Sequence, residues 1–386
     1  MVYSRVTSEY TFLNLILHNF YKWFEVSCNM LTKAELKELR DELLSSKKPL
    51  IFFDDDTDGT SSFLLFYRFL KDYTDEAKGI IVKGSPELKD PMFIRKIEEY
   101  NPDKVFVLDK PIIGQDFIDD VHKPLIWLDH HPLLVRNKVK YFNPLKHKSK
   151  MFNPDTRPTT YWAYKTVGKD RPQDMWLAMV GCVGDWFVPE FHKDFSRKYP
   201  ELLPKDLKIK SPGTVLFETR LGLLCKIINF NLKYPTKEAM TAVKILTRIN
   251  DPMEILDQMT PAGKYIYKNY LFFNEIYEKM KSQVKVTKEP LILFEYEDKY
   301  SLTADLSNEL MYNHPEKVIL IARLKSDEYR CSFRSVDLDV RSILEKALVG
   351  INGYGGGHEH ACGGSVKIPD WPKFLENLRR ELKYLN

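Results

Sequence analysis

The most informative stretch of this sequence is Leu50-Ile51-Phe52-Phe53-Asp54-Asp55-Asp56-Thr57-Asp58-Gly59-Thr60. Its apolar residues predict a buried strand, and the residues after Gly59 predict the start of a helix. If the strand stays extended, Asp54, Asp56 and Asp58 begin on one face, because side chains alternate with period two. Three crowded carboxylates repel one another unless a cation lies among them, and oxygen ligands suit Mg²⁺ or Mn²⁺. The stretch therefore predicts a metal site at the end of a strand.

Three other interpretations compete for these acids. A calcium-binding EF-hand loop that began at Asp54 would need a bidentate Glu at its twelfth position, which is Leu65, and it would follow a helix. Asp56-Thr57-Asp58-Gly59-Thr60 also resembles the first motif of haloacid-dehalogenase-type phosphatases, in which the first Asp is a nucleophile. An acidic, solvated turn is the plainest interpretation, but apolar residues lie on both sides of the acids. The metal site remains the preferred hypothesis.

Length and composition set the broad class. The 386 residues are enough for two or three domains, and 44% hydrophobic with 29% charged residues is typical of a globular protein. A net charge of +4 does not by itself indicate nucleic acid. The five cysteines are widely spaced, which argues against disulfides or a zinc site and favours the cytoplasm. No apolar run reaches the roughly 20 residues of a membrane span.

The order of elements predicts an α/β fold with a parallel sheet. Strands expected at 49–53, 80–82, 105–108 and 125–128 alternate with helices. Asp109 follows the third strand, and Asp129-His130-His131 follows the fourth, so both should lie beside the first acids at the carboxyl edge of the sheet. Asp185 ends an apolar helix, where a metal would offset its unfavourable interaction with the helix dipole. The predicted ligands of two ions are Asp54, Asp56, Asp58, Asp109, His130 and Asp185.

A second, smaller α/β domain is expected from residue 289 onward. A strand expected at 329–333 leads into Arg334-Ser335, and seven of the 17 glycines then fall between 350 and 364. So many glycines predict a loop with close backbone approach to a phosphate, which Arg334, Ser335, Gly356, Gly357 and His358 would bind. The expected divisions are 1–47 (extension and helix), 48–190 (metal-binding domain), 191–288 (helical connector) and 289–386 (substrate-binding domain).

These motifs, in this order, resemble the DHH phosphoesterase family with its DHH-associated domain. The matching motifs are Asp54-x-Asp56-x-Asp58-Gly59, Asp109, Asp129-His130-His131, Gly184-Asp185, Ser332-x-Arg334-Ser335 and Gly355-Gly356-Gly357-His358. An Asp at position 54 is similar to the pattern of the RecJ branch, and the layout of the chain resembles compact archaeal RecJ-like proteins. The resemblance implies that Asp54, Asp56 and Asp109 hold one ion, and that Asp58, Asp109, His130 and Asp185 hold another. His131 would contact the scissile phosphate, and Asp129 would orient the turn.

The resemblance implies an exonuclease that depends on Mn²⁺ or Mg²⁺. It would remove nucleoside monophosphates from an end of single-stranded DNA or RNA, in repair or replication, with a helicase or a replisome component as a possible partner. Polarity and the choice between DNA and RNA stay open. One alternative is a hydrolase for very short RNA or small nucleotides, and another is a replisome scaffold without catalysis. The chain ends about twenty residues beyond the glycines, and bacterial RecJ carries a further oligonucleotide-binding domain, so the resemblance leads us to expect weaker binding of long strands.

Overall fold

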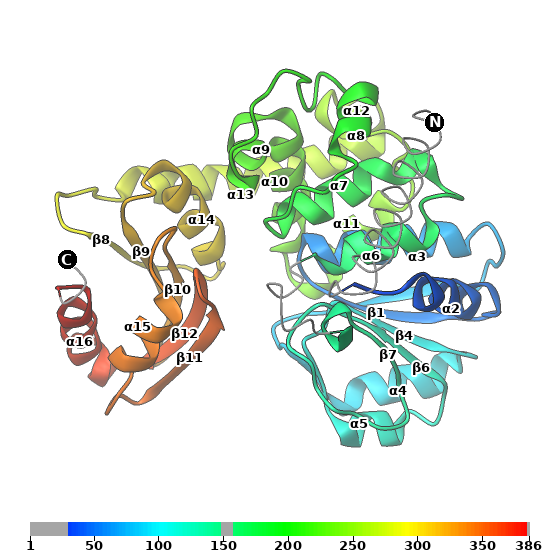
Figure 1. Cartoon of the computed structure of the whole chain (residues 1–386), viewed down its shortest axis with the longest axis horizontal. Helices are drawn as coiled ribbons and strands as arrows, with labels where there is room; N and C mark the ends of the chain where they lie inside the picture. The colour runs from blue at the N-terminus through cyan, green and yellow to red at the C-terminus, as the bar shows by residue number, and fades with distance from the viewer. Residues whose placement is uncertain (1–29, 148–156, 384–386) are drawn as a thin grey trace, which may run out of the picture. The chain divides into compact units, whose positions relative to one another are not determined.

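The computed structural model describes residues 30–147 and 157–383, and these fall into two compact units that divide between Ile266 and Tyr267 (Figure 1). The predicted extension over residues 1–29 lies outside the described residues. The finer division at 47, 190 and 288 stays a prediction, and unit 1 includes most of the segment that we expected to be a connector. Among the described residues, no helix is long and apolar enough to cross a membrane.

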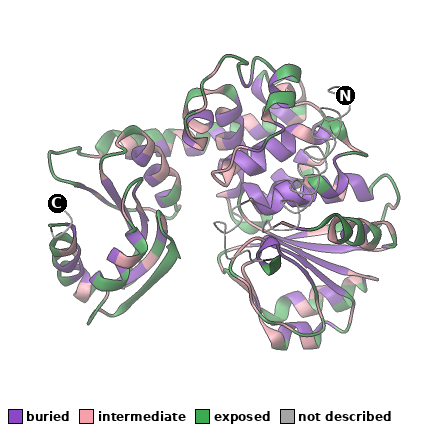
Figure 2. Cartoon of the chain, viewed as in Figure 1, coloured by how far each residue is buried: buried purple, intermediate pink, exposed green. Residues whose placement is uncertain are grey.

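Unit 1 contains a parallel sheet of five strands in the order β2-β1-β4-β6-β7. The strands are β1 (Leu50–Asp54), β2 (Lys78–Val82), β4 (Val105–Leu108), β6 (Leu125–Leu128) and β7 (Lys140–Phe142), and a separate pair consists of β3 (Glu87–Leu88) and β5 (Ile112–Ile113). The central strands β1, β4 and β6 are buried along almost their whole length, as expected when helices cover both faces of a parallel sheet (Figure 2). The four predicted strands are present, and β7 extends the sheet.

Helices cover the two faces of this sheet. One face carries α4 (Pro91–Tyr100) and α5 (Gln115–Asp120), whose Phe93, Ile97 and Phe117 pack in one core with strand residues such as Phe52 (Figure 1). The other face carries α2 (Lys33–Leu44), α3 (Thr57–Leu70), α6 (Thr159–Val167) and α7 (Met175–Gly184). The rest of the unit is helical: α8 (His192–Lys198), α9 (Pro212–Glu218), α10 (Arg220–Leu232), α11 (Thr236–Leu246), α12 (Met253–Leu256) and the start of α13 (Pro261–Gln283).

The junction between β1 and α3 differs from our expectation. The strand ends at Asp54, Asp56 caps α3 by accepting a hydrogen bond from the Gly59 N–H, and Asp58 lies in the first helical turn. The extended backbone that we assumed through the three acids is therefore not formed, and α3 begins at Thr57, before the helix start predicted after Gly59. The cap is the physical reason, because an Asp in this position satisfies an unpaired helix N–H. A Cβ on Gly59 would lie 2.7 Å from the Asp54 nitrogen, so only glycine permits this tight reversal.

Unit 2 contains a mixed sheet in the order β11-β12-β10-β9-β8. Its strands are β8 (Leu291–Glu297), β9 (Val318–Lys325), β10 (Glu328–Arg334), β11 (Gly353–His358) and β12 (Ala361–Lys367). Only the β8–β9 pair is parallel. Two helices, α15 (Val340–Ala347) and α16 (Trp371–Lys383), pack on one face through Leu344 and Phe374, while α14 (Thr303–Asn313) contacts β9 and β10.

The glycine-rich segment forms two strands, so the predicted loop is wrong. Gly355 of β11 lies opposite Gly364 of β12, and Gly356 lies opposite Gly363. A Cβ on Gly355 would come within 2.7 Å of the Leu344 Cδ2, so the absence of a side chain lets α15 pack closely against the sheet. A glycine-rich strand indicates close approach of another group, which here is a helix on one face.

Candidate metal centre

The acids of the β1–α3 junction and those after β4 and β6 meet at the carboxyl edge of the unit 1 sheet. Asp54 ends β1, which pairs with β4, and β4 in turn pairs with β6. Asp109 follows β4 and has a left-handed backbone (φ +59°), which Asp tolerates better than most residues. Parallel strands end at the same edge, so this topology brings together residues that are more than 70 positions apart in sequence.

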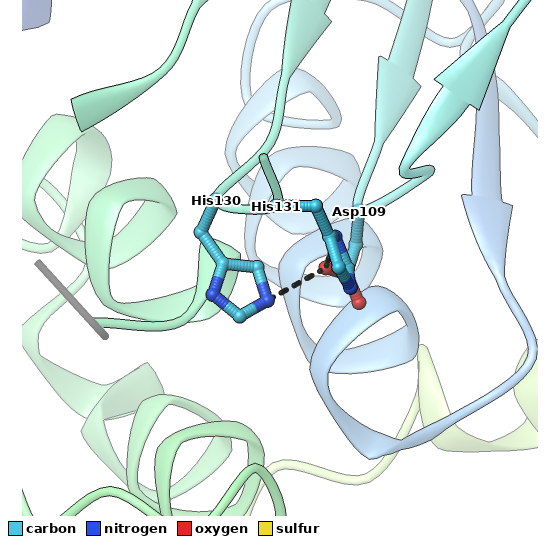
Figure 3. A group of neighbouring side chains, drawn as sticks. All are labelled: Asp109, His130 and His131. Carbon is cyan, nitrogen blue, oxygen red and sulfur yellow. Dashed lines mark ion pairs between the residues drawn. The ribbon is translucent and has the colours of Figure 1, made fainter. Parts of the chain in front are cut away.

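His130 lies among three of the acids at this edge of the sheet. Its Nε2 is 3.5 Å from Asp109 Oδ1, 3.7 Å from Asp185 Oδ2 and 3.8 Å from Asp58 Oδ2. Figure 3 shows the His130 ring directed at the Asp109 carboxylate, with His131 beside it. These separations are wider than hydrogen bonds, and they leave room for a cation that bonds to several of the atoms at once.

Ligand atoms converge in three overlapping groups. One consists of Asp54, Asp56 and Asp109, the next of Asp58, His130 and Asp185, and the last of Asp109, His130 and His131, with the ligand atoms of each group within 4.8 Å of one another. Asp109 belongs to two of these groups. Carboxylate oxygens with one or two imidazole nitrogens form a donor set that suits Mn²⁺ or Mg²⁺, so the residues present fit the implied ions.

Charge crowding also fits a bound cation. Burial and the neighbouring Asp58 carboxylate raise the pKa of Asp109 well above its usual range, and burial raises the pKa of Asp58. Burial and the charge of Asp56 raise the pKa of Asp54 to about 7. Without a cation, burial and the neighbouring carboxylates therefore disfavour the ionised form of these carboxyl groups. A divalent cation among them would supply positive charge to balance these carboxylates, which the protein's own side chains balance only in part.

The start of α6 holds two of the acids in place. The backbone N–H groups of Thr159 and Thr160 donate to the two oxygens of Asp58, at 2.8 and 2.6 Å, and the Thr159 hydroxyl donates to Asp109 Oδ1 at 3.0 Å. All four residues are buried. The sequence analysis did not assign these threonines a role at the site. Their position after Pro158 at a helix start, where N–H groups are unpaired, was the available signal.

Asp129 contacts its own turn rather than the other acids. It is fully buried, and its oxygens bond to His131 Nδ1 at 2.7 Å, to the His131 N–H at 3.1 Å and to the Tyr141 hydroxyl at 3.2 Å. Burial lowers the pKa of His131, but the hydrogen bond and ion pair with Asp129 outweigh it, so the pKa of His131 is raised. The turn thus fixes the His131 ring through one nitrogen, and Tyr141 is a supporting residue that the sequence did not indicate.

Lys110 is a further residue at the site that the sequence analysis did not identify. Its side chain is fully buried, and its ammonium donates to Asp54 Oδ1 at 2.8 Å and to the Ser85 carbonyl at 2.6 Å. A lysine directly after an Asp that ends a buried strand was the only available signal.

In unit 2, Arg334 and Ser335 lie at the end of β10. Arg334 donates through Nε to Asn308 Oδ1 at 2.7 Å and through Nη1 to the carbonyls of Phe333 and Cys362. Burial lowers the pKa of the Arg334 guanidinium to about 10. Ser335 is buried, and its hydroxyl accepts a hydrogen bond from the Leu338 N–H. The geometry places Ser335 in the turn and leaves its substrate-binding role a prediction.

The predicted glycine contacts lie on β11, which is exposed along its whole length. Arg334 pairs with Ala361, and Ala361 pairs with His358, so Arg334 and His358 are in one row across three strands and on the same face. A Cβ on Gly356 would meet nothing within 4 Å. We call Gly356, its partner Gly363, Arg334 and His358 the open strip. Its backbone is accessible because these glycines carry no side chain.

Comparison with known proteins supports this description. Residues 298–384 match the model of the DHHA1 domain. RecJ from Thermus thermophilus, solved with Mn²⁺, is 15% identical with a TM-score of 0.65 over 90% of this chain and 54% of RecJ, so the chain spans about half the length of that protein. RecJ was also solved with Mg²⁺. None of the curated proteins matches the chain.

Two further structures share the fold. The DHH domain of a member of the s1p family of ribosomal proteins is 14% identical, with a TM-score of 0.61 over 97% of this chain and 99% of that one. CDC45 from Entamoeba histolytica is 8% identical, with a TM-score of 0.51 over 90% and 98% of the two chains. The predicted α/β fold class is confirmed. The predicted resemblance is confirmed at the level of the fold: the chain shares the fold of the RecJ and DHH-domain structures, and residues 298–384 match the DHHA1 domain model.

Proposed function

We propose that this chain is a Mn²⁺- or Mg²⁺-dependent phosphodiesterase that removes nucleoside monophosphates from an end of single-stranded nucleic acid. The observation that carries the proposal is the overlap of ligand groups at Asp109. Asp54, Asp56 and Asp109 would hold one ion, and Asp58, Asp109, His130 and Asp185 would hold the other. Two such ions, when bound, polarise a phosphoryl oxygen and generate a hydroxide nucleophile at neutral pH. The binding of both ions by RecJ structures of the same fold supports this choice of cofactor.

The protein's own side chains then orient the substrate. Because Asp129 accepts from the Nδ1 side of His131, the opposite ring nitrogen is directed away from the turn. The raised pKa of His131 favours a protonated ring, which can donate to a phosphate oxygen. We assign His131 this contact with the scissile phosphate, and we assign Asp129 the role of fixing the ring. The partial exposure of His131, at 27%, is consistent with access for a substrate.

The open strip of unit 2 supports a polymeric substrate. A bare backbone on an exposed strand lets a phosphodiester approach closely, and its N–H groups can donate to phosphate oxygens. Arg334 sits in the same row as His358 and adds a fixed positive charge. We propose that this strip binds a phosphate of the substrate strand other than the scissile one.

The test is digestion of end-labelled single-stranded DNA and RNA in the presence of Mn²⁺, read as product ladders from each end. We expect single-nucleotide products from long strands, no cleavage of duplexes, and complete loss of cleavage with a chelator. Cleavage confined to two- to five-residue oligomers would show a hydrolase for short RNA instead. No cleavage of any substrate, with the fold intact and Mn²⁺ bound, would favour a non-catalytic role. The ladders also give the polarity, and a helicase or replisome partner stays a prediction.

A further inference from the structure

Lys110 is an unusual residue to find inside a protein. Its side chain is 0% exposed, although burying an ammonium is costly unless the charge is paired. Asp109, immediately before it, has a left-handed backbone. The Lys110 carbonyl accepts a hydrogen bond from Trp127 Nε1 at 3.0 Å, and that indole is itself fully buried. Backbone and side chain are therefore both held, which gives the ammonium a fixed position.

The ammonium of Lys110 connects a candidate ligand to a neighbouring loop. It donates to Asp54 Oδ1 at 2.8 Å and to the Ser85 carbonyl at 2.6 Å. Ser85 belongs to the loop between β2 and β3. Asp54 Oδ1 also accepts the Asp55 N–H at 2.9 Å. One oxygen of Asp54 is thus engaged by two donors, and the same carboxylate has an oxygen within 4.8 Å of ligand atoms of Asp56 and Asp109.

We propose that Lys110 is a positioning residue that holds the Asp54 carboxylate in the orientation in which it binds an ion of the metal centre. This inference rests on the proposed function, because it assumes that Asp54 binds an ion. Lys110 contacts no substrate and acts only through Asp54. Supporting groups that hold a ligand's orientation commonly change metal affinity by about 10–100-fold when they are removed.

Simple electrostatics predicts the opposite effect, so the direction of the change is informative. Lys110 carries a positive charge beside a cation site, and removing it would tighten Mn²⁺ binding if charge alone mattered. A weaker affinity after removal therefore indicates that orientation dominates. Lys83 provides a matched control, because its ammonium lies 3.0 Å from Asp55 Oδ2 at the same edge, and Asp55 belongs to none of the ligand groups found among the described residues.

The experiment is calorimetric titration of the metal-free full chain with Mn²⁺, which needs no catalysis. We expect Lys110→Met to weaken binding by about tenfold or more, and Lys83→Met to leave it unchanged or slightly tighter. Circular dichroism and thermal unfolding of both metal-free variants check the fold. Unchanged or tighter binding by folded Lys110→Met would overturn the proposal, as would an equal loss in Lys83→Met.

A comparison in the Asp54→Asn background tests the route through Asp54 and does not require Lys110→Met alone to fold. Asp54→Asn is compared with Asp54→Asn/Lys110→Met, which removes both members of the buried pair. We expect the two to bind Mn²⁺ equally, and a further loss in the double variant would contradict positioning through Asp54. Absence of Mn²⁺ binding by the natural chain would refute the proposed function itself. Binding and cleavage by the natural chain, with Lys110→Met unaffected, would refute only the role of Lys110.

Discussion

The candidate ligand sites of the two units are built in opposite ways. Unit 1 gathers carboxylates whose mutual repulsion and burial raise their pKa values, and donors such as Thr159 and Lys110 hold them in place. Unit 2 instead lacks side chains at its open strip, where a Cβ added to Gly356 would meet nothing within 4 Å. The first site should therefore respond to a change of charge at constant shape, and the second to a change of volume at constant charge. Each prediction below tests one side of this contrast.

The largest effect is expected from a change of charge at constant shape in unit 1. Asp56→Asn keeps an oxygen that can accept from the Gly59 N–H and so preserves the cap of α3. It removes the charge that an ion would bind. We expect cleavage to fall by about 10³-fold or more, equivalent to roughly 4 kcal/mol, and thermal stability without metal to be unchanged or higher, because one of the repelling charges is removed.

Asp56→Ala serves as the matched variant. It should lose the same activity and also about 1 kcal/mol of stability, because it removes the cap. Steady-state cleavage and thermal unfolding separate the two effects. Substantial cleavage by either variant would show that Asp56 is not a ligand.

The way in which Asp54, Asp56 and Asp58 converge shows where sequence reasoning succeeds and fails. Their proximity followed from spacing, but the alternation that we used is wrong, because a helix begins within the acids. Asp109 and His130 were placed correctly beside them, since strand ends in a parallel sheet share an edge whatever the details. The Thr159 and Lys110 contacts depend on how α6 packs and on a left-handed backbone at Asp109, and the local sequence signals of the two residues do not specify either of these features.

The glycine-rich segment also shows where reasoning from sequence succeeds and where it fails. Its composition indicated close approach to a partner, and the expected partner was a phosphate. On one face the partner is Leu344 of α15, and only on the other face is the backbone open. Which face a glycine presents depends on strand register, and register is fixed by the pairing of Gly355 with Gly364.

Metal should stabilise unit 1 strongly because it relieves the repulsion there. At a free Mn²⁺ concentration 100 times Kd, binding to the folded state alone adds about 2.7 kcal/mol to the free energy of unfolding. We expect a raised thermal midpoint with Mn²⁺ that a chelator reverses. Asp56→Asn should show a much smaller rise, and an equal rise in that variant would place the stabilising ion elsewhere.

In unit 2, we expect substrate binding to depend on side-chain volume along the open strip. Gly356→Val adds a side chain to an open strand position, where β-branched residues are well tolerated, so stability should hold. The added atoms would block a phosphodiester, and we expect KM for long strands to rise about tenfold (about 1.4 kcal/mol) while kcat is unchanged. Gly355→Ala instead presses on Leu344 and should cost about 1–3 kcal/mol of stability. An unchanged KM in Gly356→Val would remove the open strip from the substrate path.

The smallest effect should come from a single supporting hydrogen bond in unit 1. Thr159→Val keeps the backbone N–H that donates to Asp58 but removes the hydroxyl that donates to Asp109 at 3.0 Å. A lost hydrogen bond to a ligand is worth about 1 kcal/mol, so Mn²⁺ affinity should fall about fivefold. Thr166→Val is the control, because its hydroxyl bonds only to the Trp162 carbonyl at 2.8 Å in the same helix. Equal losses in the two variants would mean that helix stability, and not the orientation of Asp109, sets the affinity.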